Sequence, residues 1–252
     1  VYSPDANQWA REGERCFRRD SLLCHYYNKV MSHGKCDGFM TQKHIGYRSW
    51  NDDFPHDMLP KVAYVKGEVK GGYAFNSPDN RGFVAMEAEH YYQSQAGEGT
   101  EWSVYPSFGR TRSGVALTPY TQAVGDATLT YRFTLPEGTS RVKVHVIVKS
   151  TLDYLNKGGL VYTVSLDGGE PQRVCFNDKL NEQPENIYNI YYPTIARRVV
   201  ETVVTLAPSK QGTAHVLTLH PCDPAIVFEK IVVDAGGYQP QFLFGRESPV
   251  RR

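Results

Sequence analysis

Residues 141–149 read RVKVHVIVK, and this stretch decides the fold more clearly than any other part of the sequence. Valine occupies every second position from Val142 to Val148, whereas Lys143 and His145 lie between the valines. Successive side chains of a β-strand point to opposite faces of the sheet, so this pattern predicts a strand with one buried face.

Eight further short runs, β-branched or alternating, lie on either side of this strand. They are residues 83–88, 114–118, 129–135, 160–166, 172–176, 199–206, 214–219 and 226–234. Turn signals such as Asp167-Gly168-Gly169 separate them, and no helical pattern intervenes. Residues 82–252 are therefore predicted to form a mainly β domain, an antiparallel β-sandwich of the jelly-roll, galactose-binding-like kind.

Residues 1–33 are predicted to be a short helical segment that precedes the sandwich. Its apolar side chains recur at roughly helical spacing among charged ones: Trp9, Cys16, Leu22, Leu23 and Tyr26. Asp20 or Ser21 is suited to cap a second helix, which predicts a break near residues 18–20. Two short helices cannot bury their apolar faces alone, so we expect the remnant of a bundle domain.

Residues 34–81 are predicted to be an aromatic-rich connecting loop. Glycine, aspartate, asparagine and proline are frequent there, and Pro55, Pro60 and Pro78 interrupt regular structure. Aromatic side chains are interleaved with them, so we expect the loop to be packed down rather than disordered.

Composition and short motifs exclude several classes of function. The 28 basic and 27 acidic residues nearly cancel, which gives no reason to expect nucleic acid or a membrane surface as partner. The five cysteines form no C-x-x-C pair, so a zinc or thioredoxin-type site is disfavoured. Gly-x-Ser-x-Gly and phosphate-binding loops are absent from the sequence. Because the chain starts at Val1 without a leader pattern, we expect a truncated or processed start.

Two stretches carry a specific resemblance. The first contains GKCDGFM at 34–40, QKHIGYRSW at 42–50 and MLP at 58–60. The second contains VAMEAEHY at 84–91, FGRT at 108–111 and VFEKIVVD at 227–234. In this order they resemble the end of the helical domain and the C-terminal β-sandwich of glycoside hydrolase family 115, whose members are xylan α-1,2-glucuronidases.

The resemblance covers nearly the whole chain and implies a non-catalytic role. The family's two catalytic carboxyl groups lie upstream in an α/β barrel for which 252 residues leave no room. We therefore expect an accessory region that works with missing N-terminal catalytic domains and with a second subunit of a homodimer. The implied substrate is the glucuronoxylan of plant cell walls, and the implied location is extracellular or periplasmic. An independent carbohydrate-binding module for xylan-type glycans is the alternative.

No cofactor is required for this role, and the candidate ion is a structural Ca²⁺. The start of the sandwich resembles carbohydrate-binding modules of families 6 and 35, many of which hold calcium between their first and last strands. Carboxylate oxygens are the ligands that Ca²⁺ prefers, which makes Glu87, Glu89, Glu229 and Asp234 the candidates. The alternative is a structural edge whose inward carboxylates meet a counter-charge or hydrogen bonds.

Four residues are candidates for contact with substrate. Arg110 follows Gly109 at an expected exposed loop tip, where a guanidinium can grip a uronate carboxylate through two hydrogen bonds. We expect Arg110 to contribute little to folding there. Tyr47 and Trp102 are candidates for stacking on sugar rings, and His44 lies in the same loop as Tyr47. Core or interface packing is the alternative for these three side chains.

Overall fold

The computed structural model describes residues 6–35, 64, 71–77 and 82–251. The chain divides into two compact units, residues 1–70 and residues 71–252. None of the described helices is long and apolar enough to cross a membrane.

The described part of the first unit is mainly one continuous helix. α1 (Ala6–His25) runs directly into a π-helical turn, η1 (Tyr26–Met31), and Gly34 follows at a φ of 74°. The predicted break near residues 18–20 is therefore wrong. Neither glycine nor proline occurs between Glu14 and His25, so nothing in this stretch interrupts the backbone hydrogen bonds. Several apolar side chains of this helix are exposed, namely Trp9, Leu22, Leu23, Tyr26, Val30 and Met31.

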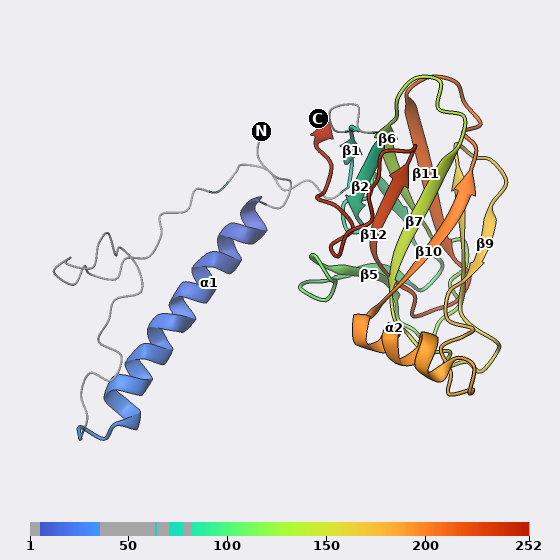
Figure 1. The fold of residues 1–252 in the computed structure, drawn as a ribbon. Helices are drawn as coiled ribbons and strands as arrows, with labels where there is room; N and C mark the ends of the chain where they lie inside the picture. The colour runs from blue at the N-terminus through green and yellow to red at the C-terminus, as the bar shows by residue number, and fades with distance from the viewer. Residues whose placement is uncertain (1–5, 36–63, 65–70, 78–81, 252) are drawn as a thin grey trace. The chain divides into compact units, whose positions relative to one another are not determined.

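The second unit is an antiparallel β-sandwich of two sheets (Figure 1). The first sheet has the order β13 (Val250–Arg251), β1 (Ala74–Phe75), β6 (Thr128–Thr134), β11 (Ala214–Pro221), β8 (Val161–Leu166) and β9 (Gln172–Cys175), with β3 (Gln93–Gln95) also pairing with β6. The second has the order β10 (Val199–Leu206), β7 (Val142–Lys149), β12 (Val227–Asp234), β5 (Gly114–Thr118) and β4 (Glu101–Tyr105), with β2 (Phe83–Glu87) also pairing with β12. Only the short β1–β6 pair is parallel among the described strands.

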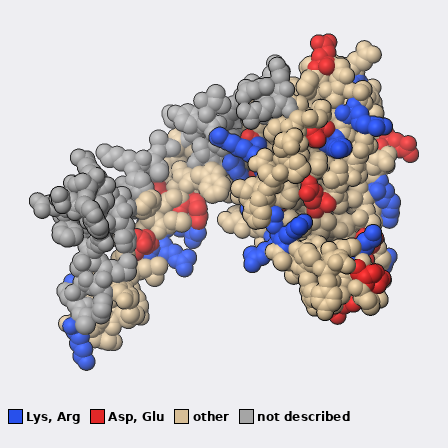
Figure 2. All heavy atoms as spheres, viewed as in Figure 1, with Lys and Arg blue, Asp and Glu red and all other residues tan. Residues whose placement is uncertain are grey.

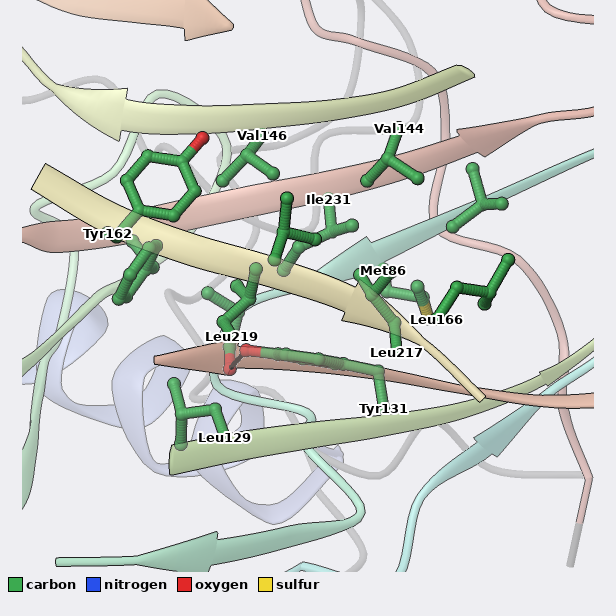
Figure 3. Close-up of a cluster of buried hydrophobic side chains, with 14 of the residues drawn as sticks. Met86, Leu129, Tyr131, Val144, Val146, Tyr162, Leu166, Leu217, Leu219 and Ile231 are labelled. Atoms are coloured by element: carbon green, nitrogen blue, oxygen red, sulfur yellow. Dashed lines mark hydrogen bonds between the residues drawn. The ribbon is translucent and has the colours of Figure 1, made fainter. Parts of the chain in front are cut away.

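The main hydrophobic core fills the space between the two sheets (Figure 3). Val144 and Val146 of β7 point into it together with Leu217 and Leu219 of β11, so the predicted strand and its buried valine face are confirmed. The opposite face is also buried at His145 and Ile147, which the alternation did not predict. Tyr131 is fully buried, and its hydroxyl donates a hydrogen bond to the carbonyl of Ala88 at 2.9 Å. That bond satisfies a polar group that would otherwise be costly to bury.

A second, smaller core covers the opposite face of the second sheet. Residues 235–249, called the C-terminal strap from here on, bring Tyr238 and Phe244 against Ile147, Val232 and Ala85. Both faces of β12 are consequently buried, although its sequence contains Glu229 and Lys230. Two charged residues in a strand buried on both faces must be paired.

All nine predicted strands are confirmed, each within two residues of its predicted ends. The sequence did not predict β1, β3, β4, β13 or the helical segment of η3 (Ile187–Tyr191) and α2 (Tyr192–Arg197). Because β1 joins the first sheet, the sandwich begins before residue 82. The helical segment was missed because Pro193 and Asn189 suggest a loop, although proline is well tolerated in the first turn of a helix.

Candidate functional site

The loop of residues 109–113, between β4 and β5, binds four carboxylates with four consecutive residues. The Arg110 amide donates to Glu229 (2.7 Å), the Thr111 hydroxyl donates to Glu87 (2.7 Å), Arg112 lies 3.8 Å from Glu247, and Ser113 hydrogen-bonds Glu89. A Cβ atom on Gly109 would lie 2.5 Å from the carbonyl oxygen of Ser113, so the loop closes this tightly only with glycine there.

Two lysine side chains supply opposite charge to Glu87 and Glu229. Lys230 is only 2% exposed, and its ammonium lies 2.9 Å from Glu87. It also donates to the carbonyls of Leu243 (3.2 Å) and Gly245 (2.6 Å), which belong to the C-terminal strap. Lys149 lies 3.4 Å from Glu229. Glu87 and Glu229 therefore each have a lysine as counter-charge, whereas Glu89 is hydrogen-bonded by Ser113.

His90 and Glu247 form a second buried pair beside the loop. Their Nδ1 and Oε1 atoms are 2.6 Å apart, and the same oxygen accepts the amide of Glu87 at 3.0 Å. Burial opposes the charge of the imidazole, but the hydrogen bond and charge of Glu247 outweigh it and raise the pKa of His90. Burial likewise opposes the charge of Glu247, but the hydrogen bond from His90 lowers the pKa of this carboxyl group.

The Arg110 guanidinium joins three separate segments. It donates to the carbonyl of Phe242 in the strap at 3.3 Å and to the carbonyl of Arg197 at the end of α2. Its carbon Cζ lies 4.4 Å from the centre of the Phe242 ring and 5.6 Å from that of Phe244. The expectation of an exposed loop tip is therefore wrong, because the Arg110 side chain is half-buried and hydrogen-bonded. Its small contribution to folding stays a prediction. Its position at a helix C-terminus also places a cation where the helix dipole favours one.

A pocket of about 320 Å³ opens where these segments meet. It is lined by Ser107, Phe108, Gly109, Arg110, Lys149, Ala196, Arg197, Arg198, Val199 and Phe242. We call it the basic pocket, because four of its lining residues are Arg or Lys and none is Asp or Glu. Figure 2 shows basic side chains gathered on this face of the sandwich beside α2. Arg197 and Arg198 are exposed, whereas Arg110 and Lys149 are half-buried.

The family model for the glycosyl hydrolase family 115 C-terminal domain matches residues 78–247. The chain belongs to this family. No curated protein matches the sequence at a significant level.

Solved structures resemble this family 115 domain at low identity. A family 115 4-O-methyl-α-glucuronidase with specificity for decorated arabinogalactans is 15% identical with a TM-score of 0.42, and the match covers 60% of this chain and 18% of that protein. The C-terminal family 6 carbohydrate-binding module of a laminarinase from Zobellia galactanivorans is 13% identical (TM-score 0.40), covering 60% of this chain and 98% of the module. A carbohydrate-binding module of a Cellvibrio mixtus lichenase is 17% identical with a TM-score of 0.38, and the match covers 60% of this chain and 95% of the module.

The family 115 domain brings three of the four candidate calcium ligands together. Glu87, Glu89 and Glu229 surround the loop of residues 109–113, whereas Asp234 lies at the other end of β12, opposite Phe83. Asp234 instead accepts the amides of Gly236 and Tyr238 in the strap. Within the described ranges, no group of three His, Cys, Asp or Glu residues is arranged to hold a metal ion. The calcium site stays a prediction.

Of the four candidate sugar-binding residues, the structure describes Trp102 and Arg110, and these two do not share a site. Trp102 packs on the core, 6.4 Å from the ring of Phe228, and its indole N–H donates to the carbonyl of Gln95 at 2.6 Å. His44 and Tyr47 lie outside the described residues. Of the two described candidates, Trp102 does not line the basic pocket, whereas Arg110 does. Its partners Arg197 and Phe242 were missed because they come from segments without a periodic pattern.

The charges around the loop predict that stability falls in alkaline solution. Glu247, with a lowered pKa, contributes stability above 4.5 and loses it as the pH falls further. His90, with a raised pKa, contributes fully below 6.5 and loses its contribution as the pH rises through its folded pKa. Burial raises the pKa values of Glu89 and Glu229, so their ionisation lowers the stability as the pH rises from 4.5 through their folded pKa values. We expect the melting temperature to fall as the pH rises above 6.5 and through the folded pKa of His90.

The variant His90→Gln tests whether His90 causes this pH dependence of stability. It should flatten the pH dependence and lower the free energy of unfolding at pH 6 by about 1.5–3 kcal/mol, because a charge-assisted hydrogen bond is lost. Thermal melts across the pH range measure both the pH dependence of the melting temperature and the loss of stability at pH 6. His220→Gln is the matched control, since His220 bonds the carbonyl of Ala127 away from the loop. An unchanged slope in His90→Gln would contradict the assignment.

Proposed function

We propose that this domain is the non-catalytic C-terminal accessory region of a family 115 xylan α-1,2-glucuronidase. In this role it packs against the catalytic domains, assembles with a second subunit, and helps to complete the partner subunit's site for the uronate of glucuronoxylan. The parent enzyme acts in the extracellular or periplasmic space. The basic pocket, with Arg110 at its wall, is the observation that carries the proposal.

The chemistry of the pocket suits a carboxylated sugar. A guanidinium has five N–H donors in one plane, and Arg110 directs Nη1 to Phe242 and Nη2 to Arg197. Further donors remain for a carboxylate, and Arg197 and Arg198 add positive charge at the rim. Arg110 covers one face of the Phe242 ring and Lys149 one face of the Phe108 ring, and the exposed remainder of both rings is an apolar surface on which a sugar can pack. The volume of about 320 Å³ fits a single sugar unit rather than a chain.

The carboxylates beside the pocket support a non-catalytic role. A glycosidase needs two carboxyl groups about 5–10 Å apart, both free to reach the scissile bond. Glu87 is paired with Lys230 inside the protein, and Glu229 is bound by the Arg110 amide and by Lys149. Carboxylates held in this way support the loop that carries Arg110.

Calorimetric titration of the full chain tests the proposal. We expect an aldouronic acid to bind and Arg110→Ala to lower its affinity about tenfold, the effect of losing one charged hydrogen bond. Arg110→Lys should restore only part of the affinity, because an ammonium lacks the planar pair of donors. Arg141→Ala, at an exposed position directly before β7, is the control. Unchanged binding by the Arg110→Ala variant would refute the assignment of the pocket.

A second role is favoured by exposed aromatic rings near α2. Tyr188 is 74% exposed and Phe242 is 75% exposed, which suits an independent carbohydrate-binding module for xylan-type glycans. The neutral xylo-oligosaccharide of matching length distinguishes the two roles. Binding of the neutral and the acidic glycan with equal affinity would favour the module, whereas preference for the acid favours the accessory role.

A further inference from the structure

The sandwich has one long strand edge that lacks the usual protection against pairing with another chain. β10 is the terminal strand of the second sheet and pairs only with β7 among the described strands (Figure 1). Its eight residues pair without a bulge, from Val199 opposite Lys149 to Leu206 opposite Val142. Alternate N–H and C=O groups of an antiparallel strand face each side, so half of those in β10 face its free side.

The other edges of the described sandwich are short or covered. β9 has four residues, contains Arg173 and follows Pro171; β4 has five residues, starts at Glu101 and is followed by Pro106. The free side of β2 is covered by the strap, because the Ser248 amide donates to the carbonyl of Ala85 at 2.8 Å. Short strands, prolines, charged residues and covering segments are the known means of blocking edge-to-edge association.

β10 has only one of these features, a single charged residue. Six of its eight residues are β-branched, and it contains no proline, lysine or arginine. Its one charged residue, Glu201, lies 2.7 Å from Nδ1 of His145 on β7. That contact draws the carboxylate over the sheet instead of leaving it at the edge. Val203 is 50% exposed at the middle of the strand.

We propose that β10 is an interface at which two copies of this chain pair through their β10 strands in antiparallel fashion, about a two-fold axis at Val203. The inference rests on the two-subunit assembly proposed above and assigns a surface to it. In this register Val203 faces its own copy, Glu201 faces Thr205, and Val200 faces Leu206. No like charges oppose each other, and inward-facing residues meet inward-facing residues, so the two sheets continue into one.

The same strand is suited to its own copy for a geometric reason. Antiparallel pairing about a two-fold axis presents identical hydrogen-bonding edges to each other, so one sequence satisfies both sides. The central contact buries Val203 against Val203, which removes the exposed apolar side chain of this edge from water.

Sedimentation equilibrium of the full chain tests this interface. We expect a reversible dimer, and we expect Val203→Lys to weaken dimerisation by about 100-fold, since two ammonium groups would then meet on the axis. The matched control is Val104→Lys, which makes the same change at a valine that is 41% exposed on β4. Both variants should melt within a few degrees of the unmodified chain.

A cysteine variant tests the register of the proposed β10–β10 pairing directly. Val203→Cys should form a disulfide-linked dimer on oxidation with oxidised glutathione, because the two thiols face each other across the axis. Thr205→Cys should not, because it faces Glu201 in this register. A monomeric unmodified chain would overturn both the interface and the two-subunit assembly. A dimer that persists in Val203→Lys and gains no disulfide link in Val203→Cys would overturn the interface alone.

Discussion

Lys230→Met is expected to lower the free energy of unfolding of the sandwich by about 3–5 kcal/mol, because it leaves the buried carboxylate of Glu87 without its cation. The ammonium is 2% exposed and contacts Glu87 and two carbonyls of the strap, so no water replaces it. A methionine fills similar volume but cannot donate. Urea unfolding followed by circular dichroism measures the loss.

Two further variants isolate the charge from the packing. Lys143→Met makes the same substitution at an exposed position of β7 and should change stability by less than about 0.5 kcal/mol. The double variant Glu87→Gln with Lys230→Met should recover part of the loss, because the unpaired buried charge is gone. If Lys230→Met unfolds at the same urea concentration as the unmodified chain, the ion pair does not stabilise the fold.

Phe228→Ala is expected to cost about 3–5 kcal/mol, the usual effect of removing a fully buried aromatic side chain. The ring meets Tyr162 edge-on at 5.5 Å and lies 6.4 Å from Trp102, so its loss leaves a cavity between the two sheets. Phe242→Ala is the control, since that ring is 75% exposed. Equal melting temperatures for the two variants would contradict this account of the core.

The long strands could be predicted from the sequence because the alternation of apolar residues lies within each strand itself. Val142 to Val148 alternate along one strand, and the burial of one face follows from that period alone. β1 and β13 have two residues each, and β3 has three, which is too short for any period to be read. The strap was missed because its order depends on contacts with Ile147 and Val232 rather than on a repeat of its own.

The candidate site was only half predictable for the same reason. Glu87 and Glu229 stood out as carboxylates in apolar strands, and both do lie beside the loop of residues 109–113. Lys230 gave the same signal, because it is a charged residue within an apolar strand. Such a residue needs a partner of opposite charge if the strand is buried on both faces. Glu247 and Phe242 carried none, because only the three-dimensional path of the strap brings them to Arg112 and Arg110.

The strap also sets an order of events during synthesis. Lys230 leaves the ribosome before the carbonyls of Leu243 and Gly245, and Glu87 leaves long before Glu247. Until those last residues emerge, Lys230 can pair with Glu87 but lacks the two strap carbonyls that accept its other hydrogen bonds. The sheets are therefore expected to close in their final form only after translation has passed Ser248, so that a nascent domain halted earlier stays a target for chaperones.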